Sequence, residues 1–172
     1  MSESSATYAP PEDPAGRFLW KLCRASAVVG GYMLAVSALI TTVSVSLNAA
    51  FKAPILGEYE MVSFGTSLAI YLFLPWCQVV RGNIVVDFFL AGASVRVREA
   101  FDALGALIYL IMAVLLLWRL SVGGLELYAQ AQATAVLKLP YWWSFPIILY
   151  SLALLIAVTA HGIVANIRRA LA

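Results

Sequence analysis

Charged residues are scarce in this chain: Asp, Glu, Lys and Arg together make up only 12% of its 172 residues. Hydrophobic residues make up 63%, and no soluble domain of this size could hide that fraction in a core. The low charge therefore excludes a soluble globular protein and indicates that lipid is the solvent. The formal net charge of +2 then reflects basic residues that orient the chain in the membrane, and we expect no nucleic-acid partner.

Residues that carry chemistry are scarce as well. The chain has one His, His161, and two Cys, Cys23 and Cys77. A single imidazole with no other ligand spaced to join it makes no metal site. Both Cys are expected near the cytoplasmic face, where thiols stay reduced, so a disulfide is not expected. No phosphate-binding loop or nucleophile elbow is present. The sequence therefore predicts neither an enzyme nor a cofactor-binding protein.

Long apolar runs are what the sequence has in abundance. A helix needs about 20 apolar residues to cross the hydrocarbon core. We place four transmembrane helices at residues 26–48, 61–80, 103–122 and 141–164. None of them has a carboxylate pair, a His cluster or a helix break near its middle. The sequence thus predicts an all-α membrane protein of four spans that holds or positions something else.

The remaining segments complete the predicted organisation. Residues 1–16 contain Ser, Pro and three acids with almost nothing to bury, which predicts a disordered tail. Residues 17–25 form a basic interfacial segment, and residues 26–168 form the four-helix transmembrane domain. A short interfacial helix is expected at residues 88–93.

Basic residues are unevenly distributed around the spans. Eight lie before the first span, between the second and third, or after the fourth, whereas the two other loops carry only Lys52 and Lys138. Because cytoplasmic loops are enriched in Lys and Arg, we expect both termini and the middle loop in the cytoplasm. Lys52 and Lys138 then lie outside.

Small and weakly polar residues recur at helical spacing along each span. Such residues mark faces that meet other helices, because they allow close approach and hydrogen bonding in lipid. The sequence does not say which stripe packs inside this chain and which against another protein. The stripes are Ser26, Gly30, Ser37, Thr41, Ser44 and Asn48 on the first span, Glu60, Ser63, Ser67, Tyr71, Gln78 and Arg81 on the second, Gly105, Tyr109, Met112, Arg119 and Gly123 on the third, and Ser144, Ser151, Thr159 and Gly162 on the fourth.

Three short segments resemble a known family. They are Glu58-Tyr59-Glu60 at the start of the second span, Arg81-Gly82-Asn83-Ile84-Val85-Val86-Asp87 at its end, and Leu137-Lys138-Leu139-Pro140 followed by Tyr141-Trp142-Trp143. With the four-span layout, they resemble the small membrane subunit, of DctQ type, of tripartite ATP-independent periplasmic (TRAP) transporters. Family members commonly have His where this chain has Asn83, and this departure removes any role that needs a titrating imidazole.

The resemblance implies a multi-pass subunit in the bacterial inner membrane. In such systems a periplasmic binding protein captures an organic acid, and a large membrane subunit moves it inward with sodium or another cation gradient. The small subunit is implied to scaffold the large one and to help dock the binding protein, for which Lys52 and Lys138 are candidate contacts. The candidate subunit-interface or structural residues are Glu58, Glu60, Ser63, Ser67, Tyr71, Gln78, Arg81, Asn83 and Asp87.

A different reading of the polar stripes stays open. If they line a symmetric pore, the chain is a self-sufficient homo-oligomeric channel or small carrier. The purified chain alone would then conduct or exchange a solute.

Overall fold

The structure, a computed structural model, describes the backbone of residues 13–80 and 95–171 and the side chains of residues 13–80 and 104–164. It confirms the predicted all-α architecture, with four helices long and apolar enough to cross a membrane. The described elements are α1 (Pro14–Phe51), α2 (Glu58–Val79), α4 (Val95–Ala129), the short 3-10 helix η2 (Tyr141–Ser144) and α5 (Phe145–Leu171).

All four helices extend beyond the spans expected from hydropathy at one end or both, and α1 and α4 extend the furthest. Helix α1 begins at Pro14, where proline suits the first helical turn, and runs without a break through the basic segment 17–25. Helix α4 continues to Ala129, past the predicted span end at residue 122. The interfacial helix expected at residues 88–93 lies outside the described residues.

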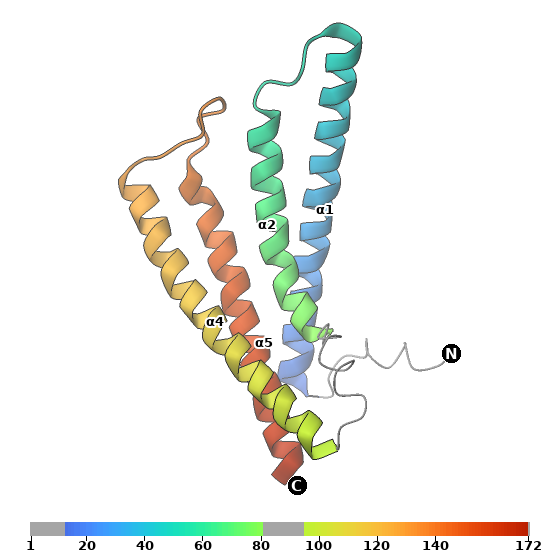
Figure 1. The fold of residues 1–172 in the computed structure, drawn as a ribbon, viewed down its shortest axis with the longest axis vertical. Helices are drawn as coiled ribbons and strands as arrows, with labels where there is room; N and C mark the ends of the chain where they lie inside the picture. The colour runs from blue at the N-terminus through green and yellow to red at the C-terminus, as the bar shows by residue number, and fades with distance from the viewer. Residues whose placement is uncertain (1–12, 81–94, 172) are drawn as a thin grey trace, which may run out of the picture.

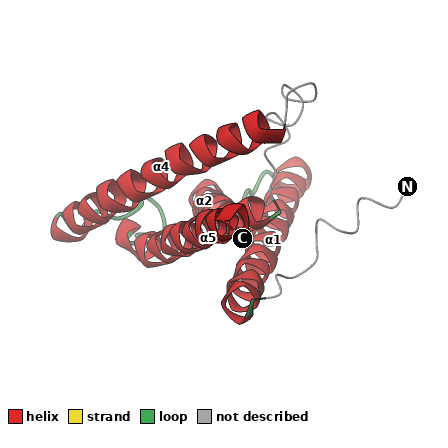
Figure 2. Cartoon of the chain, turned by 90° about the horizontal axis from the view of Figure 1, so that it is seen from below, coloured by secondary structure: helices red, strands yellow, loops and turns green. Residues whose placement is uncertain are grey.

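The four helices form two antiparallel pairs that meet along one line. Helix α1 packs on α2, helix α4 packs on α5, and the pairs join through α2 and α5. Figure 1 shows the pairs diverging toward the end that carries the two connections, residues 52–57 and 130–140, which we call the loop end. Figure 1 shows α5 between α4 and the α1–α2 pair toward the loop end, and Figure 2 shows α4 along one edge of the bundle. Helix α4 is therefore the most peripheral element.

Helices α1 and α2 approach closely because the residues between them are small. Every seventh residue of α1 is buried and small, which keeps one seam turned toward the partner helix. A Cβ added at Gly30 would lie 3.3 Å from the Ala69 carbonyl oxygen, and one added at Gly65 would lie 2.5 Å from Ser37 Oγ. The buried seam of α1 consists of Gly16, Cys23, Gly30, Ser37 and Ser44.

The second contact region is a small apolar core where α2, α4 and α5 meet. Its buried members are Leu68, Ala113, Ile148, Leu152 and Leu155. Most other large apolar side chains of the described spans are exposed, including Leu39 at 64% and Trp118 at 68%. Water could not solvate such a surface, so lipid or another membrane protein must cover it.

The structure distinguishes the stripes that pack inside the chain from those that do not. On α1, Ser26 is buried and its Oγ lies 3.4 Å from Tyr150 Oη of α5. On α5, Ser151 and Thr159 are also buried. In contrast, Ser67 of α2 and Arg119 of α4 are exposed. Most of the α1 and α5 stripes is thus internal and most of the α4 stripe turns outward, whereas the α2 stripe is divided, with Ser67 exposed and Tyr71 packed on the apolar core.

Candidate interaction surface at the loop end

A single carboxylate at the loop end joins the start of α2 to the connection between α4 and α5. Glu60 lies in the first turn of α2, where the partial positive charge of the helix terminus favours an acid. Its Oε1 accepts a hydrogen bond from the Val136 N–H and its Oε2 accepts one from the Leu137 N–H, each at 2.8 Å. The side chain therefore clamps two adjacent backbone donors that are 76 and 77 residues away along the chain.

The connection between α4 and α5 is ordered by its own hydrogen bonds. The Thr134 N–H donates to the Leu139 carbonyl at 2.9 Å, and the Leu139 N–H donates to Thr134 Oγ1 at 3.0 Å. The Tyr141 N–H donates to the Gln132 carbonyl at 3.1 Å. These bonds close the loop into a compact turn. The backbone N–H groups of Val136 and Leu137 in this turn donate to Glu60. Thr134 is only 2% exposed, which fits its double role.

The connection between α1 and α2 packs against the same turn. Lys52 ends α1 in the left-handed conformation, with its N–H donating to the Asn48 carbonyl. The Ile55 N–H donates to Ser44 Oγ at 3.1 Å. Gly57 has φ +78°, and a Cβ there would lie 2.6 Å from Leu137 Cγ, so glycine is required both by conformation and by space.

Aromatic rings pack at both ends of the bundle. Near the loop end, Phe64 stacks on Tyr141 with ring centroids 5.6 Å apart, and Tyr128 meets Trp142 edge to face at 5.4 Å. At the other end, Trp20 meets Trp76 at 5.6 Å. Because Trp and Tyr favour the membrane–water boundary, the two groups mark the expected levels of the lipid headgroups.

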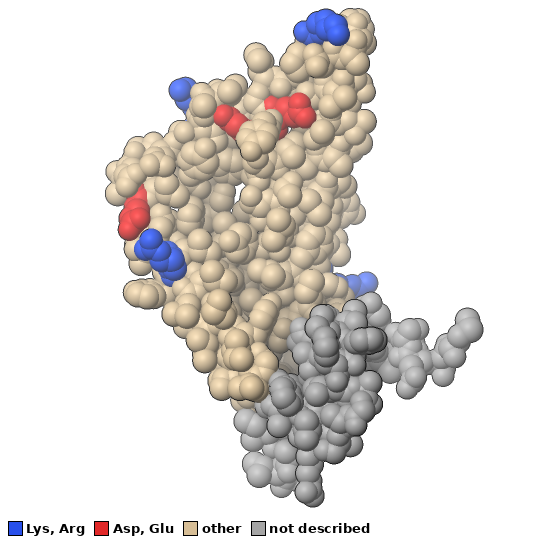
Figure 3. Space-filling view, viewed as in Figure 1, with Lys and Arg blue, Asp and Glu red and all other residues tan. Residues whose placement is uncertain are grey.

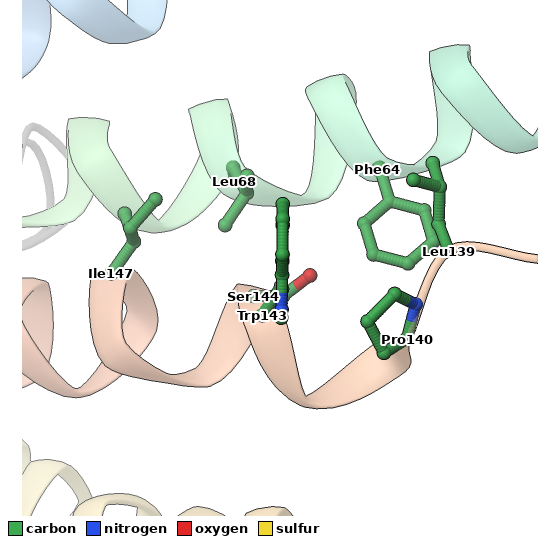
Figure 4. Close-up of a pocket in the computed structure, with 7 residues that line it drawn as sticks. All are labelled: Phe64, Leu68, Leu139, Pro140, Trp143, Ser144 and Ile147. Atoms are coloured by element: carbon green, nitrogen blue, oxygen red, sulfur yellow. The ribbon is translucent and has the colours of Figure 1, made fainter. Parts of the chain in front are cut away.

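Close to the Phe64–Tyr141 stack, a small cavity of about 170 Å³ opens between α2 and the start of α5. Figure 4 shows Phe64 and Leu68 of α2 facing Trp143 and Ile147 across it. Nearly all of its lining is apolar, so it offers no set of polar groups to orient a solute. The lining residues are Phe64, Leu68, Leu139, Pro140, Trp143, Ser144 and Ile147.

The outer surface of the loop end combines charge with exposed apolar residues. Lys52 and Lys138 are exposed, and Leu56 and Tyr59 are 82% and 84% exposed. Figure 3 shows basic and acidic side chains close together on this end of the molecule. Within the part of the chain that the structure describes, no group of three His, Cys, Asp or Glu could hold a metal ion. Exposed apolar side chains of this size, close to charged ones, are typical of surfaces that contact another macromolecule.

The structure places the predicted site residues in different settings. Glu58 and Glu60 are half-buried at the loop end, and Lys52 and Lys138 are exposed there. The remaining predicted residues of α2 are Ser63 and Gln78, which are half-buried, Ser67, which is exposed, and Tyr71, which packs on the apolar core. Arg81, Asn83 and Asp87 lie outside the described residues.

Sequence reasoning missed three residues that shape this surface. Gly57 and Thr134 did not stand out, because neither the positive φ nor the loop's internal bonds leave a mark in local sequence. Leu137 was noticed only as part of a short segment, although its backbone N–H is what Glu60 binds. A Gly immediately before a predicted helix is the one signal that could have pointed to Gly57.

The family model described as tripartite ATP-independent periplasmic transporters, DctQ component, matches residues 37–169. The match covers the part of α1 from residue 37 onward, all of α2, α4 and η2, and nearly all of α5. It therefore includes Glu60, the turn that Glu60 binds and both lysines of the loop end. Comparisons with curated proteins and with solved structures found no match.

Proposed function

Since this chain belongs to the DctQ component family of tripartite ATP-independent periplasmic transporters, we propose that it is the fixed scaffold on which the large membrane subunit of such a transporter works. The family makes it a small membrane component of a TRAP transporter and a multi-pass membrane protein. It is a family of transporter components, not of enzymes.

The chemistry of the buried residues is the observation that carries the scaffold role. Among the described residues, the buried polar side chains are all hydroxyls, and no ionisable side chain other than the Cys23 thiol is buried in the spans. A subunit that moved an organic anion by itself would need charged groups that face the interior of its helix bundle, or broken helices, near the middle of the membrane. A fixed support needs only close helix packing, which the small residues between α1 and α2 supply.

Docking of the periplasmic binding protein is the second part of the proposal. The distribution of Lys and Arg favours an orientation with the loop end in the periplasm. The Glu60 bonds hold the start of α2 to the α4–α5 connection, and Gly57 lies against Leu137, so Lys52, Lys138 and the exposed Leu56 and Tyr59 form one preorganised surface. A binding protein that carries an organic acid would meet this surface before delivering its cargo to the large subunit. The transport itself would be driven by sodium or another cation gradient in the inner membrane.

Co-purification tests the scaffold role directly. The chain is tagged at its C-terminus, extracted from its native membrane in mild detergent, and its partners are identified by mass spectrometry. We expect a large membrane protein in a stoichiometric amount. A chain that purifies alone or only as a homo-oligomer in several mild detergents would contradict the scaffold and favour the channel or carrier.

A further inference from the structure

Arg119 occupies an unusual position on α4. It and Glu126 are the only charged residues between Leu104 and Ala129, and Figure 3 shows a basic and an acidic side chain on the α4 edge of the molecule, away from the lysines of the loop end. The helix continues for ten residues beyond Arg119, to Ala129, which is about 15 Å of helix. Tyr128, which packs on Trp142, marks the boundary near that helix end. With Tyr128 at the headgroup level, Arg119 lies nine residues, or about 13 Å along the helix, deeper, within a hydrocarbon core about 30 Å thick.

The side of α4 that carries Arg119 is not the side that packs on α5. Helix α4 packs through Ala113, which is 2% exposed, and Gly124, where a Cβ would lie 2.6 Å from a ring carbon of Phe145. At 3.6 residues per turn, Arg119 is rotated by roughly 120–140° from both. Its side chain is exposed. The guanidinium therefore leaves the bundle instead of entering it.

The neighbours of Arg119 on this side leave room for another helix. Gly105 and Gly123 lie about four turns and one turn away along the same side, and a Cβ added at either would have nothing within 4 Å. Met112 lies between them and is 54% exposed. We call these four residues, Gly105, Met112, Arg119 and Gly123, the Arg119 face.

An arginine within the hydrocarbon is costly to leave against lipid, and such residues normally face protein or a water-filled cavity. We propose that the Arg119 face is covered by a transmembrane helix of the large subunit, and that a carboxylate on that helix pairs with the Arg119 guanidinium. A carboxylate is the complement because the guanidinium presents two parallel N–H donors in its plane. This inference rests on the proposed function and adds to it the face and the chemistry of the contact.

A second copy of this chain fits the same face poorly. Two copies in one orientation related by a two-fold axis would place their Arg119 residues at the same depth, where like charges repel. Glu126 cannot relieve this, because it lies seven residues, or about 10 Å, farther along the helix. The face therefore favours a partner with a different sequence.

Substitutions of Arg119 test the contact in the full complex. Arg119→Leu and Arg119→Glu are each co-expressed with the large subunit, and the amount of large subunit that co-purifies is measured. We expect it to fall about tenfold or more, because a buried carboxylate loses its partner. The thermal stability of the isolated chain should be unchanged or higher, since Arg119 makes no internal packing. Leu107→Ala, at an exposed position on another side of α4, is the matched control and should co-purify like the wild type.

A photo-reactive amino acid in place of Met112 identifies what covers the face. Cross-linking to the large subunit is expected. Cross-linking only to a second copy or only to lipid would overturn the inference, as would undiminished co-purification of both Arg119 variants. If the wild-type chain itself brings down no large subunit, the proposed function fails as well, so the two failures are distinguishable.

Discussion

Glu60 shows how one side chain can set the shape of a membrane protein's outer end. Its two oxygens accept the N–H groups of consecutive residues in a turn, and ionised acceptors make stronger hydrogen bonds than neutral ones. The residue therefore acts as a structural tie between α2 and the α4–α5 connection, and any docking role of this surface depends on it.

Replacing Glu60 should loosen the α4–α5 connection. We expect Glu60→Ala to lower the melting temperature of the detergent-solubilised chain by about 2–4 °C. We also expect it to speed proteolysis within residues 131–140. Glu60→Gln keeps one acceptor oxygen and should give an intermediate effect. Glu58→Ala is the control, and an equal response from both sites would argue against a specific tie.

At the scale of the element, the seam between α1 and α2 depends on residues too small to separate the backbones. Gly30 and Ser37 face Ala69 and Gly65 so closely that a larger side chain would force the helices apart. Bulky apolar residues elsewhere on α1, such as Val36 and Leu39, are exposed and meet lipid. In a bilayer, close packing replaces the hydrophobic effect as the force that joins helices.

Gly30 and Gly31 form a matched pair for testing this seam. Gly30→Leu should lower the free energy of unfolding by about 1–3 kcal/mol, because it overpacks a tight contact. Gly31→Leu should change it by less than about 0.5 kcal/mol, because nothing lies within 4 Å of a Cβ there. Both substitutions raise the helix propensity equally, so the difference between their free energies of unfolding reports the close contact at Gly30. Unfolding in mixed micelles measures it, and equal values for the two variants would refute the close approach.

At the scale of the whole molecule, two helix pairs meet along α2 and α5 and diverge toward the loop end (Figure 1). The apolar core is small, and much of α4 is uncovered. A chain with so little internal packing is better suited to packing against a partner subunit than to transporting a solute alone. This arrangement agrees with a small component of a larger transporter.

Thiol labelling tests both the orientation and the docking surface. In a background with Cys23 and Cys77 changed to Ser, Lys138→Cys should react with a membrane-impermeant maleimide on intact spheroplasts. Lys21→Cys, near the start of α1, should react only after permeabilisation. Added binding protein of the same transporter should slow the labelling of Lys138→Cys severalfold. Labelling of Lys21→Cys from outside would reverse the orientation, and labelling unaffected by the binding protein would count against docking at Lys138.

The sequence by itself determined the class, the four spans and the family. Bilayer thickness requires runs of about 20 apolar residues, and these are visible without any tertiary contact. Periodicity is also a property of a single helix, so the stripes that include Ser37, Ser67 and Arg119 could be found from residue spacing alone.

Only the tertiary structure decided where each stripe faces and what Glu60 binds. Most of the α1 and α5 stripes packs inside and most of the α4 stripe faces out, whereas the α2 stripe is divided between Ser67, which is exposed, and Tyr71, which packs on the core. Glu60 pairs with backbone donors more than 70 residues away, which no local pattern encodes. The extension of α4 to Ala129 likewise places Arg119 ten residues before the end of its helix, instead of three residues before the predicted span end at residue 122. The physical reason is that the length and periodicity of a helix are properties of that helix alone. Which of its sides packs inside, and which distant residues it binds, depend on how the helices pack together.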